Sequence, residues 1–212
     1  MNFLAVDTSG NHLSVVAVKN GAAFSSFLSD CATKHSVSLM AAVQETLQKA
    51  DMSLDDCDFF AAVVGAGSFT GIRIGISAVK GFCLACKKPS LPVTSFDVAA
   101  YNAIDKQKNP TGKLLCLVDA LHGYYYACGY ENGEVVLQPA YLSEEEVLTL
   151  ATQGYTLRST SALPLSEKAE VELVSPVTGL ENAVAALAKA GRFGELAAVY
   201  VRKSSAEINL GK

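Results

Sequence analysis

The glycine-rich run "VGAGSFTGIRIG", residues 64–75, is the stretch whose residue types most suggest chemistry. It lacks the lysine of a P-loop, and its glycine spacing differs from the dinucleotide-binding pattern. It retains a tight turn at the start of a helix, where exposed N–H groups can hold an anion. Ser68 or Thr70 can equally cap that helix without a ligand. The run therefore predicts either a structural elbow or an anion site at Gly67, Ser68, Thr70 and Gly71.

Residues that could hold a metal are present but poorly grouped. His35 lies near the start of a predicted helix, yet the residue one turn later is Leu39, so no histidine pair shares a helix face. Cys83 and Cys86 form a C-x-x-C spacing near the end of another predicted helix, whereas reactive cysteines are activated at helix N-termini. Most of the six cysteines lie in apolar runs, which is typical of buried free thiols. We predict no metal site and no cofactor.

The composition excludes several classes of protein. Half of the 212 residues are hydrophobic and 18% are charged, but no apolar run approaches the roughly 18–20 residues of a membrane helix. The start "MNFLAVDTSG" reaches an aspartate before a signal-peptide core can form. The net charge of -4 argues against a broad basic face for nucleic acid. We expect a cytoplasmic protein that contacts no membrane and meets nucleic acid only indirectly.

The first half of the chain must position the glycine run, and its pattern predicts a mixed sheet with helices. Asn20-Gly21 is a strong hairpin signal between two alternating runs. The apolar periodicity predicts strands at 3–6, 13–19, 22–28, 59–64 and 91–94, and helices at 36–50 and 71–86. The polar stretch "DKQKNPTGK", residues 105–113, is the predicted linker.

The second half repeats the first. Strands are predicted at 114–118 and 124–130, and Asn132-Gly133 is a second hairpin signal. Asp119 follows the strand predicted at 114–118, as Asp7 follows the strand predicted at 3–6. Asp7 and Asp119 are 112 positions apart, and so are the two Asn-Gly turns. A helix is predicted after Ser143, and a capping box at Thr178 before a last helix. These patterns predict two lobes, residues 1–104 and a smaller, more degenerate lobe at 105–212.

Several stretches of this chain resemble one known family. They are "AVDTSGNHLSVVAV", "HSVSLM", "GAGSFTGIRIGISAVKGF", "VDALHGYYYACGY" and "YVRKSSAE". Together they look like the bacterial TsaB family, also called YeaZ, and the duplicated plan is similar to that of actin and the sugar kinases. The resemblance implies an α/β, two-lobed actin-like (ASKHA, ribonuclease H-like) fold, in which each lobe is a mixed sheet with helices.

The resemblance also implies a function. The family is similar to TsaD, once described as a glycoprotease, and acts with it in forming threonylcarbamoyladenosine in tRNA. In that scheme the TsaB-like chain does no chemistry and stabilises its catalytic partner. The implied partners are a TsaD-like subunit in a heterodimer, a second copy in a homodimer, and a TsaE-like ATPase in a larger complex, with tRNA contacted only indirectly. Ala66 replaces the family's usual proline, and Leu121-His122 replaces its usual arginines.

Asp7, Thr8 and Ser9 resemble the first phosphate loop of the actin-like group. A carboxylate there can hold a metal-bound water, and hydroxyls can contact phosphate oxygens. In the second copy, Asp119 is followed by Leu121, a bulky residue where backbone must approach phosphate closely. We therefore expect no working nucleotide clamp. An ATP-binding transferase, a metallopeptidase and a nucleotide-sensing homodimer are the alternatives.

The helix predicted at 71–86 carries more apolar residues than one sheet can cover. Its polar residues Arg73, Ser77 and Lys80 fall on one narrow stripe. The helix either lies buried in its own lobe or pairs with a partner. On the second interpretation, the expected partner interface consists of His35, Leu39, Met40, Val43, Arg73, Ile74, Gly75 and Ala78.

Overall fold

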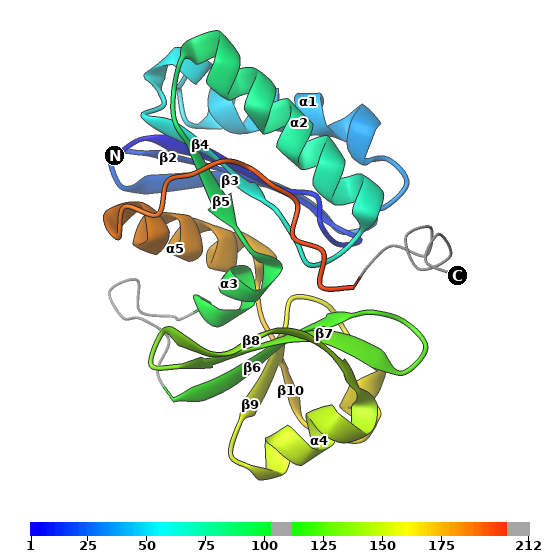
Figure 1. Cartoon of the computed structure of the whole chain (residues 1–212). Coiled ribbons are helices and arrows are strands. Elements are labelled where there is room, and N and C mark those ends of the chain that lie inside the picture. The colour runs from blue at the N-terminus through cyan, green and yellow to red at the C-terminus, as the bar shows by residue number, and fades with distance from the viewer. Residues whose placement is uncertain (103–111, 203–212) are drawn as a thin grey trace, which may run out of the picture.

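The computed structural model describes residues 1–102 and 112–202. Two five-stranded sheets lie one above the other, with two helices between them and further helices on their outer faces (Figure 1). The sheets belong to successive halves of the chain, as the repeated pattern predicts. Most of the predicted linker at 105–113 lies outside the described residues.

The first sheet has the strand order β3-β2-β1-β4-β5. Its antiparallel meander turns at Asn20 and Gly21, which both have positive φ, as a tight hairpin requires. The two later strands run parallel to β1, and this calls for helical crossovers. The strands are β1 (Phe3–Asp7), β2 (Leu13–Lys19), β3 (Ala22–Leu28), β4 (Phe59–Val63) and β5 (Ser90–Val93).

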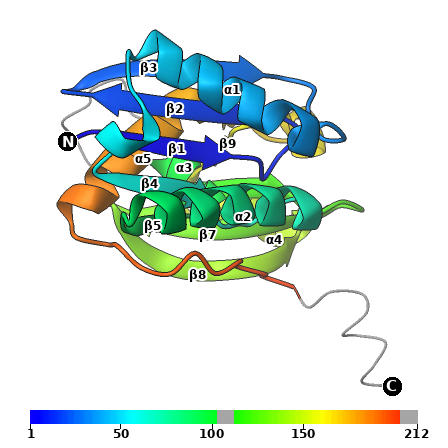
Figure 2. The ribbon, with the colours of Figure 1, turned by 90° about the horizontal axis from the view of Figure 1, so that it is seen from above.

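Two helices cover one face of this sheet. Helix α1 (His35–Lys49) follows β3, and α2 (Phe69–Cys86) follows β4, with a short 3-10 turn η1 (Leu54–Asp56) between them. Figure 2 shows α1 and α2 side by side on the same face of the sheet. Ser68 caps α2, since its hydroxyl accepts from the N–H of Gly71, and the helix begins two residues before the predicted start.

The second sheet repeats the topology of the first. Its order, β10-β9-β6-β7-β8, is again a meander followed by two parallel strands on the far side of the first strand. Helix α4 (Glu144–Thr152) is capped by Ser143, as predicted. The remaining elements are β6 (Lys113–Asp119), β7 (Tyr124–Glu131), β8 (Glu134–Ser143), β9 (Thr156–Ser159), η2 (Pro164–Glu167) and β10 (Val171–Leu173).

Two helices lie between the sheets, and each packs on the sheet of the other half. Helix α3 (Ser95–Ala100) follows the first sheet, yet Phe96 and Ala99 pack against strands β6 and β7 of the second. Helix α5 (Pro176–Lys189) follows the second sheet, yet Leu180 and Val184 lie in the core of the first. The expected second lobe, residues 105–212, includes α5 in sequence, whereas α5 packs on the sheet of the first lobe.

Two details of these helices differ from the sequence-based expectation. The short helix α3 is absent from the predicted elements. Helix α5 begins at Pro176 and is capped by Ser175, so the predicted capping box at Thr178 is wrong. The structural reason is that proline is favoured at the first helical position, which moves the cap to the residue before it.

A C-terminal strap, residues 191–202, returns to the first sheet and then reaches the second. The N–H of Gly194 donates to the carbonyl of Ser90 on β5, and the N–H of Val199 donates to the carbonyl of Val64. Leu196 is buried in the same core as α1 and α2. The strap, drawn in orange to red in Figure 2, passes along the edge of the first sheet at β5. It thereby pairs part of an otherwise open edge strand.

Helix α2 is long and apolar enough, by length and composition alone, to cross a membrane, and it is the one such helix in the described part of the chain. Core helices of soluble proteins pass the same test. Ile72, Ile76, Val79 and Phe82 of α2 are buried in the core of the first lobe, as in a helix that covers a sheet.

Candidate functional site: the Asp7 loop and the groove between α1 and α2

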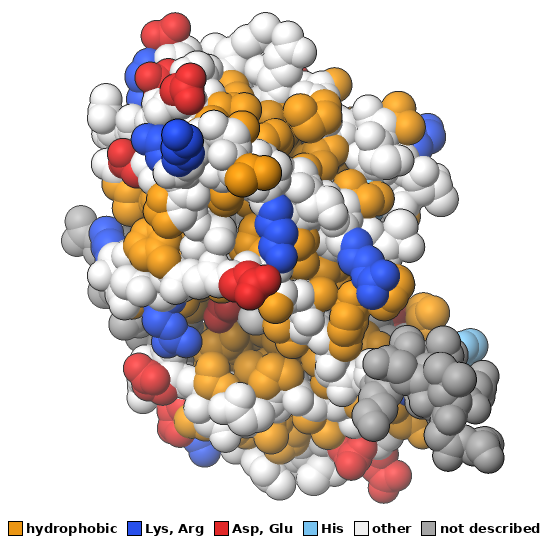
Figure 3. Space-filling view, turned by 45° about the horizontal axis from the view of Figure 1, so that its top comes forward, with side chains coloured by type: hydrophobic (Ala, Val, Ile, Leu, Met, Phe, Trp, Pro, Cys, Tyr) orange, Lys and Arg blue, Asp and Glu red, His pale blue; other side chains and the backbone are white. Residues whose placement is uncertain are grey.

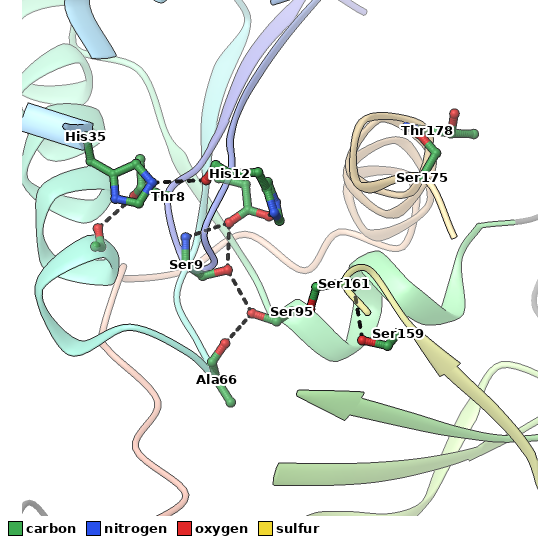
Figure 4. A network of polar contacts seen from close by, with 12 residues as sticks. Thr8, Ser9, His12, His35, Ala66, Ser95, Ser159, Ser161, Ser175 and Thr178 are labelled. Atoms are coloured by element: carbon green, nitrogen blue, oxygen red, sulfur yellow. Dashed lines mark hydrogen bonds and ion pairs between the residues drawn. The ribbon is translucent and has the colours of Figure 1, made fainter. Parts of the chain in front are cut away.

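The carboxylate of Asp7, at the end of β1, is buried, and both of its oxygens are engaged by the chain's own side-chain and backbone groups. Figure 4 shows Ser9, His12 and Ser95, which belong to this network. Its Oδ1 accepts from the Ser9 N–H at 2.8 Å and from the Ser9 hydroxyl at 2.6 Å. Its Oδ2 lies 3.2 Å from Nε2 of His12. The Ser95 hydroxyl contacts both the Ser9 hydroxyl and the Ala66 carbonyl. The network joins the β1–β2 loop to the glycine run and to the start of α3.

Asp7 and His12 form an ion pair in a setting that water scarcely reaches. Burial alone would raise the pKa of Asp7, but the hydrogen bond and charge of His12 and the two Ser9 donors outweigh it, so that pKa is lowered. Burial alone would lower the pKa of His12, but the hydrogen bond and charge of Asp7 raise it. The ring of His12 thus lies directly against the Asp7 carboxylate and engages its Oδ2.

The backbone of Thr8 and Ser9 fills the space that the glycines leave open. A β-carbon would collide with the Ser9 carbonyl oxygen if placed on Gly67, and with the Thr8 carbonyl oxygen if placed on Gly71. The Thr8 hydroxyl also donates to the carbonyl of Gly71 at 2.7 Å. These glycines are required because two backbone segments meet here.

The N–H groups at the start of α2 are partly taken by the protein itself. The Ser68 N–H donates to the Ser9 carbonyl at 2.7 Å, and the Gly71 N–H donates to the Ser68 hydroxyl at 3.2 Å. The geometry is that of an elbow held by the β1–β2 loop. Anion binding at Gly67, Ser68, Thr70 and Gly71 stays a prediction.

Asp119, the counterpart of Asp7 at the end of β6, has different surroundings. Its Oδ1 accepts from the Leu121 N–H at 2.8 Å, which closes a local turn. Leu121 and His122 both have positive φ, and the Leu121 side chain is exposed. The structure therefore joins Asp7 and Ser9 in one network and leaves Asp119 in a separate turn.

His35 is the first residue of α1 and is buried, with 1% of its surface exposed. Its Nε2 lies 3.0 Å from the carbonyl oxygen of His12. Because a carbonyl only accepts, Nε2 carries the proton, and Nδ1 has no partner within the described residues. His35 therefore lies at the end of α1 and connects this helix to the loop that carries His12, with its side chain buried inside the chain.

The other expected interface residues divide into two groups. Leu39, Val43 and Gly75 are buried within the first lobe, although Leu39 still lines the groove described below. Met40 and Arg73 are exposed, and Ile74 and Ala78 are half-buried. The sequence pattern does not separate these two groups, because a helix covering a sheet presents one apolar stripe inward and another outward.

The exposed group lines a groove of about 530 Å³ between α1 and α2. Leu39 lies in it despite being almost fully buried, and Arg73 is its one charged lining residue in the described part of the chain. The other lining residues are Ser36, Met40, Phe69, Thr70, Ile74, Ser77 and Ala78. The groove is therefore lined mostly by apolar side chains and small hydroxyls.

Four residues of these sites are not predicted from the sequence. His12 and Ser95 complete the Asp7 network, and Phe69 and Tyr200 flank Arg73. The spacing of five residues between Asp7 and His12 across the turn after β1 is a signal that could have suggested the first. Ser95 and Tyr200 meet their partners across 86 and 127 positions, which local pattern does not reveal.

The cysteines are all free, and no group of three metal-binding side chains occurs among the described residues. Cys31, Cys57, Cys116 and Cys128 are buried, whereas Cys83 and Cys86 are partly exposed. Burial raises the pKa of Cys57 to about 12 and of Cys128 to about 11. Burial also raises the pKa of Cys83.

The two sheets share one topology, and each packs against the helix that follows the other sheet in the chain. This arrangement defines a two-lobed actin-like protein of the ribonuclease H-like group. A crystal structure from Pseudomonas aeruginosa, of an uncharacterized protein with similarity to peptidase YeaZ, has a TM-score of 0.77 and 27% identity. The match covers 95% of this chain and 99% of that chain. The actin-like fold expected from the sequence is confirmed.

Sequence comparison narrows the class to a family. A family model described as "TsaD: tRNA N6-adenosine threonylcarbamoyltransferase" matches residues 29–208. The TsaB protein of Escherichia coli (strain K12) is 32% identical over 154 residues, which is 68% of this chain and 65% of that protein. The TsaB protein of Buchnera aphidicola subsp. Schizaphis graminum is 30% identical over 134 residues, 63% of this chain and 62% of that protein.

The chain belongs to this family, in its TsaB (YeaZ) branch. The match spans slightly less than two thirds of the length of these two relatives. Both relatives are described as tRNA threonylcarbamoyladenosine biosynthesis proteins. The family resemblance stated from the sequence motifs is confirmed.

Proposed function

We propose that this chain is a non-catalytic subunit in the formation of threonylcarbamoyladenosine in tRNA, and that it binds and activates a TsaD-like catalytic subunit. The relatives' description supports the pathway, and the groove between α1 and α2 supports the role of a binding partner. In this proposal the chain contacts tRNA only through the complex, and a TsaE-like ATPase joins the larger assembly.

The observation that carries the proposal is the uncovered apolar surface over α1 and α2. Hydrophobic side chains gather on this face, in the upper part of Figure 3. Val37 is 81% exposed, Met40 55% and Phe69 45%, although they lie on helices whose other faces form the core. Contiguous apolar surface of this kind marks interaction sites in soluble proteins. A stable interface of standard size would bury about 800 Å² of it per partner.

The arrangement around Asp7 supports the non-catalytic part of the proposal. Catalysis by an actin-like phosphoryl transferase needs a carboxylate that is free to hold a metal-bound water. Both oxygens of Asp7 are engaged by Ser9 and His12, and Asp119 closes a local turn. These contacts count against the alternative of an ATP-binding transferase.

Co-purification tests the proposal. The chain, carrying an affinity tag at its N-terminus, is expressed in its native cell and isolated, and the bound proteins are identified by mass spectrometry. A TsaD-like subunit in stoichiometric amount is expected, and the threonylcarbamoyladenosine content of tRNA should fall when the chain is depleted. Unchanged tRNA modification after depletion contradicts the proposed pathway. Recovery of a second copy alone favours the homodimer.

A further inference from the structure

The guanidinium of Arg73 is held in one position by two aromatic side chains. Its central carbon lies 3.8 Å from the centroid of the Phe69 ring, one helical turn earlier in α2. Its Nε donates to the hydroxyl of Tyr200 in the C-terminal strap at 2.9 Å. The rings of Phe69 and Tyr200 stack with centroids 5.2 Å apart. An exposed arginine held in this way loses little further freedom when it binds a ligand.

Arg73 has no counter-charge in the described part of the chain. Three other cations on the same lobe are paired: Lys80 with Glu195, Lys19 with Asp51 and Lys49 with Glu45. Arg73 forms no ion pair with any described acidic residue, and Nε is the one guanidinium nitrogen with a hydrogen bond among them. Nη1 and Nη2 therefore remain as an open fork.

The fork lies beside an apolar groove. Phe69, Arg73 and Ile74 all line the space between α1 and α2, where the remaining lining residues are apolar or carry small hydroxyls. An occupant that fills this groove covers the guanidinium and removes water from it. A covered arginine needs an acceptor, since burying an unpaired charge is costly.

We propose that Arg73 is the specificity anchor of the α1–α2 groove and binds, end-on through Nη1 and Nη2, one carboxylate of the protein that fills it. The inference rests on the proposed function, and it adds the chemistry that the TsaD-like subunit presents: an apolar segment carrying an aspartate or glutamate. A planar carboxylate matches the two-pronged edge of a guanidinium. Because Nε is already bonded to the Tyr200 hydroxyl, the carboxylate binds at the end-on edge formed by Nη1 and Nη2.

A carboxylate fits this surface better than a nucleic-acid phosphate. Binding of a polynucleotide depends on neutralising several phosphates with several cations. The groove offers one cation, in a chain of net charge -4, and its walls are apolar. Single charge pairs that become covered at protein interfaces, in contrast, contribute strongly to the choice of partner.

Tyr200 acts as a positioning residue in this arrangement. Its hydroxyl orients the guanidinium and its ring supports Phe69, while it does not line the groove itself. The strap therefore contributes to recognition from a segment 127 positions away from Arg73. Loss of the hydroxyl alone should weaken binding only through Arg73.

The first experiment measures the affinity of the full chain for the TsaD-like subunit of the same genome by isothermal titration calorimetry. Arg73→Ala and Arg73→Lys should each weaken binding by a factor on the order of 30 or more. Arg73→Lys should weaken binding as well, because a lysine ammonium cannot form two parallel hydrogen bonds to one carboxylate. Lys80→Ala, which removes the same charge from a paired site on the same helix, is the control and should bind as the parent does. Equal binding by parent, Arg73→Ala and Arg73→Lys overturns the inference while leaving the proposed function intact.

The second experiment identifies the carboxylate. Arg73→Glu should abolish binding, and replacing one exposed aspartate or glutamate of the TsaD-like subunit by arginine should restore it. Failure of every such replacement to restore binding contradicts a carboxylate partner. Binding of the parent chain that appears only with added tRNA, and that Arg73→Ala abolishes, assigns the fork to phosphate and also overturns the inference. If the parent chain does not bind the TsaD-like subunit at all, the proposed function fails.

A double-mutant cycle tests the positioning role. Tyr200→Phe keeps the stacked ring and should weaken binding by a factor of roughly 3–10, as expected for loss of one hydrogen bond. In the Arg73→Ala background the same change should have no further effect. An equal loss in both backgrounds shows that Tyr200 acts independently of Arg73 and contradicts this part of the inference.

Discussion

The main-chain carbonyl oxygen of Thr8 lies 2.0 Å from the point that a β-carbon on Gly71 would occupy. The loop after β1 and the first turn of α2 are therefore in direct backbone contact. This contact explains why the run that first suggests a phosphate site is rich in glycine.

Gly71→Ala should destabilise the protein, because the backbone of Thr8 and the side chain of Ser68 leave no room for a methyl group. The expected loss is about 1–3 kcal/mol of unfolding free energy, measured by urea denaturation. Gly81→Ala is the matched control on the same helix, where nothing lies within 4 Å of the added carbon. It should stabilise by about 0.5–1 kcal/mol. A Gly71→Ala variant as stable as the parent would show that the loop yields easily.

The Asp7–His12 pair should make stability depend on pH. Because the pKa of His12 is raised above its ordinary 6.5, its contribution is complete below about pH 6.5 and is lost as pH rises through its folded-state pKa. Because the pKa of Asp7 is lowered below 3.8, its contribution is complete above that value and is lost as pH falls through the folded-state pKa. The pair should therefore contribute most in mildly acidic solution.

The measurement compares the parent with an Asp7→Asn/His12→Gln variant by urea denaturation from about pH 4.5 to about pH 10. The stability difference between them should shrink toward the alkaline end. His12→Ala alone should cost roughly 3 kcal/mol at neutral pH, since it leaves a buried carboxylate unpaired. A stability difference that stays constant over the whole range would contradict a charged His12.

The isolated chain should neither hydrolyse ATP nor retain a transition metal. Both oxygens of Asp7 are engaged, and the described residues hold no group of three metal-binding side chains. Phosphate release and elemental analysis of the purified chain check this directly. Turnover that disappears in Asp7→Asn but persists in Asp119→Asn would instead support an ATP-dependent transferase.

Ala78→Arg should separate assembly from folding. Ala78 is half-buried and lines the groove, so a bulky cation there should block the partner while the isolated chain melts near the parent temperature. Ile76→Arg is the contrasting variant, because Ile76 is 8% exposed and lies in the core, and it should destabilise the fold itself. Pull-down of the TsaD-like subunit and thermal unfolding are measured together. Normal pull-down by Ala78→Arg would place the interface elsewhere.

The sequence by itself determined the repeat and most local elements of the first half, but it did not predict α3, β9 or β10. Apolar alternation and the two Asn-Gly turns predict the meanders of both sheets, because strand direction and hairpin geometry depend on neighbouring residues. The shared offset of Asp7 and Asp119 predicts two related halves, and the two sheets do share one topology. The motifs also identify the family, since they combine residues that one fold requires in a fixed order.

Only the tertiary structure decided which surfaces are free. Helix α3 packs on the second sheet and α5 on the first, and Tyr200 contacts Arg73 from the end of the chain. Periodicity marks a helix face as apolar but does not say what covers it, so it could not show that His35 and Val43 are buried within the chain itself. It also did not reveal that His12 neutralises Asp7. Such contacts depend on how distant segments pack, and packing is set by the whole core rather than by any local run.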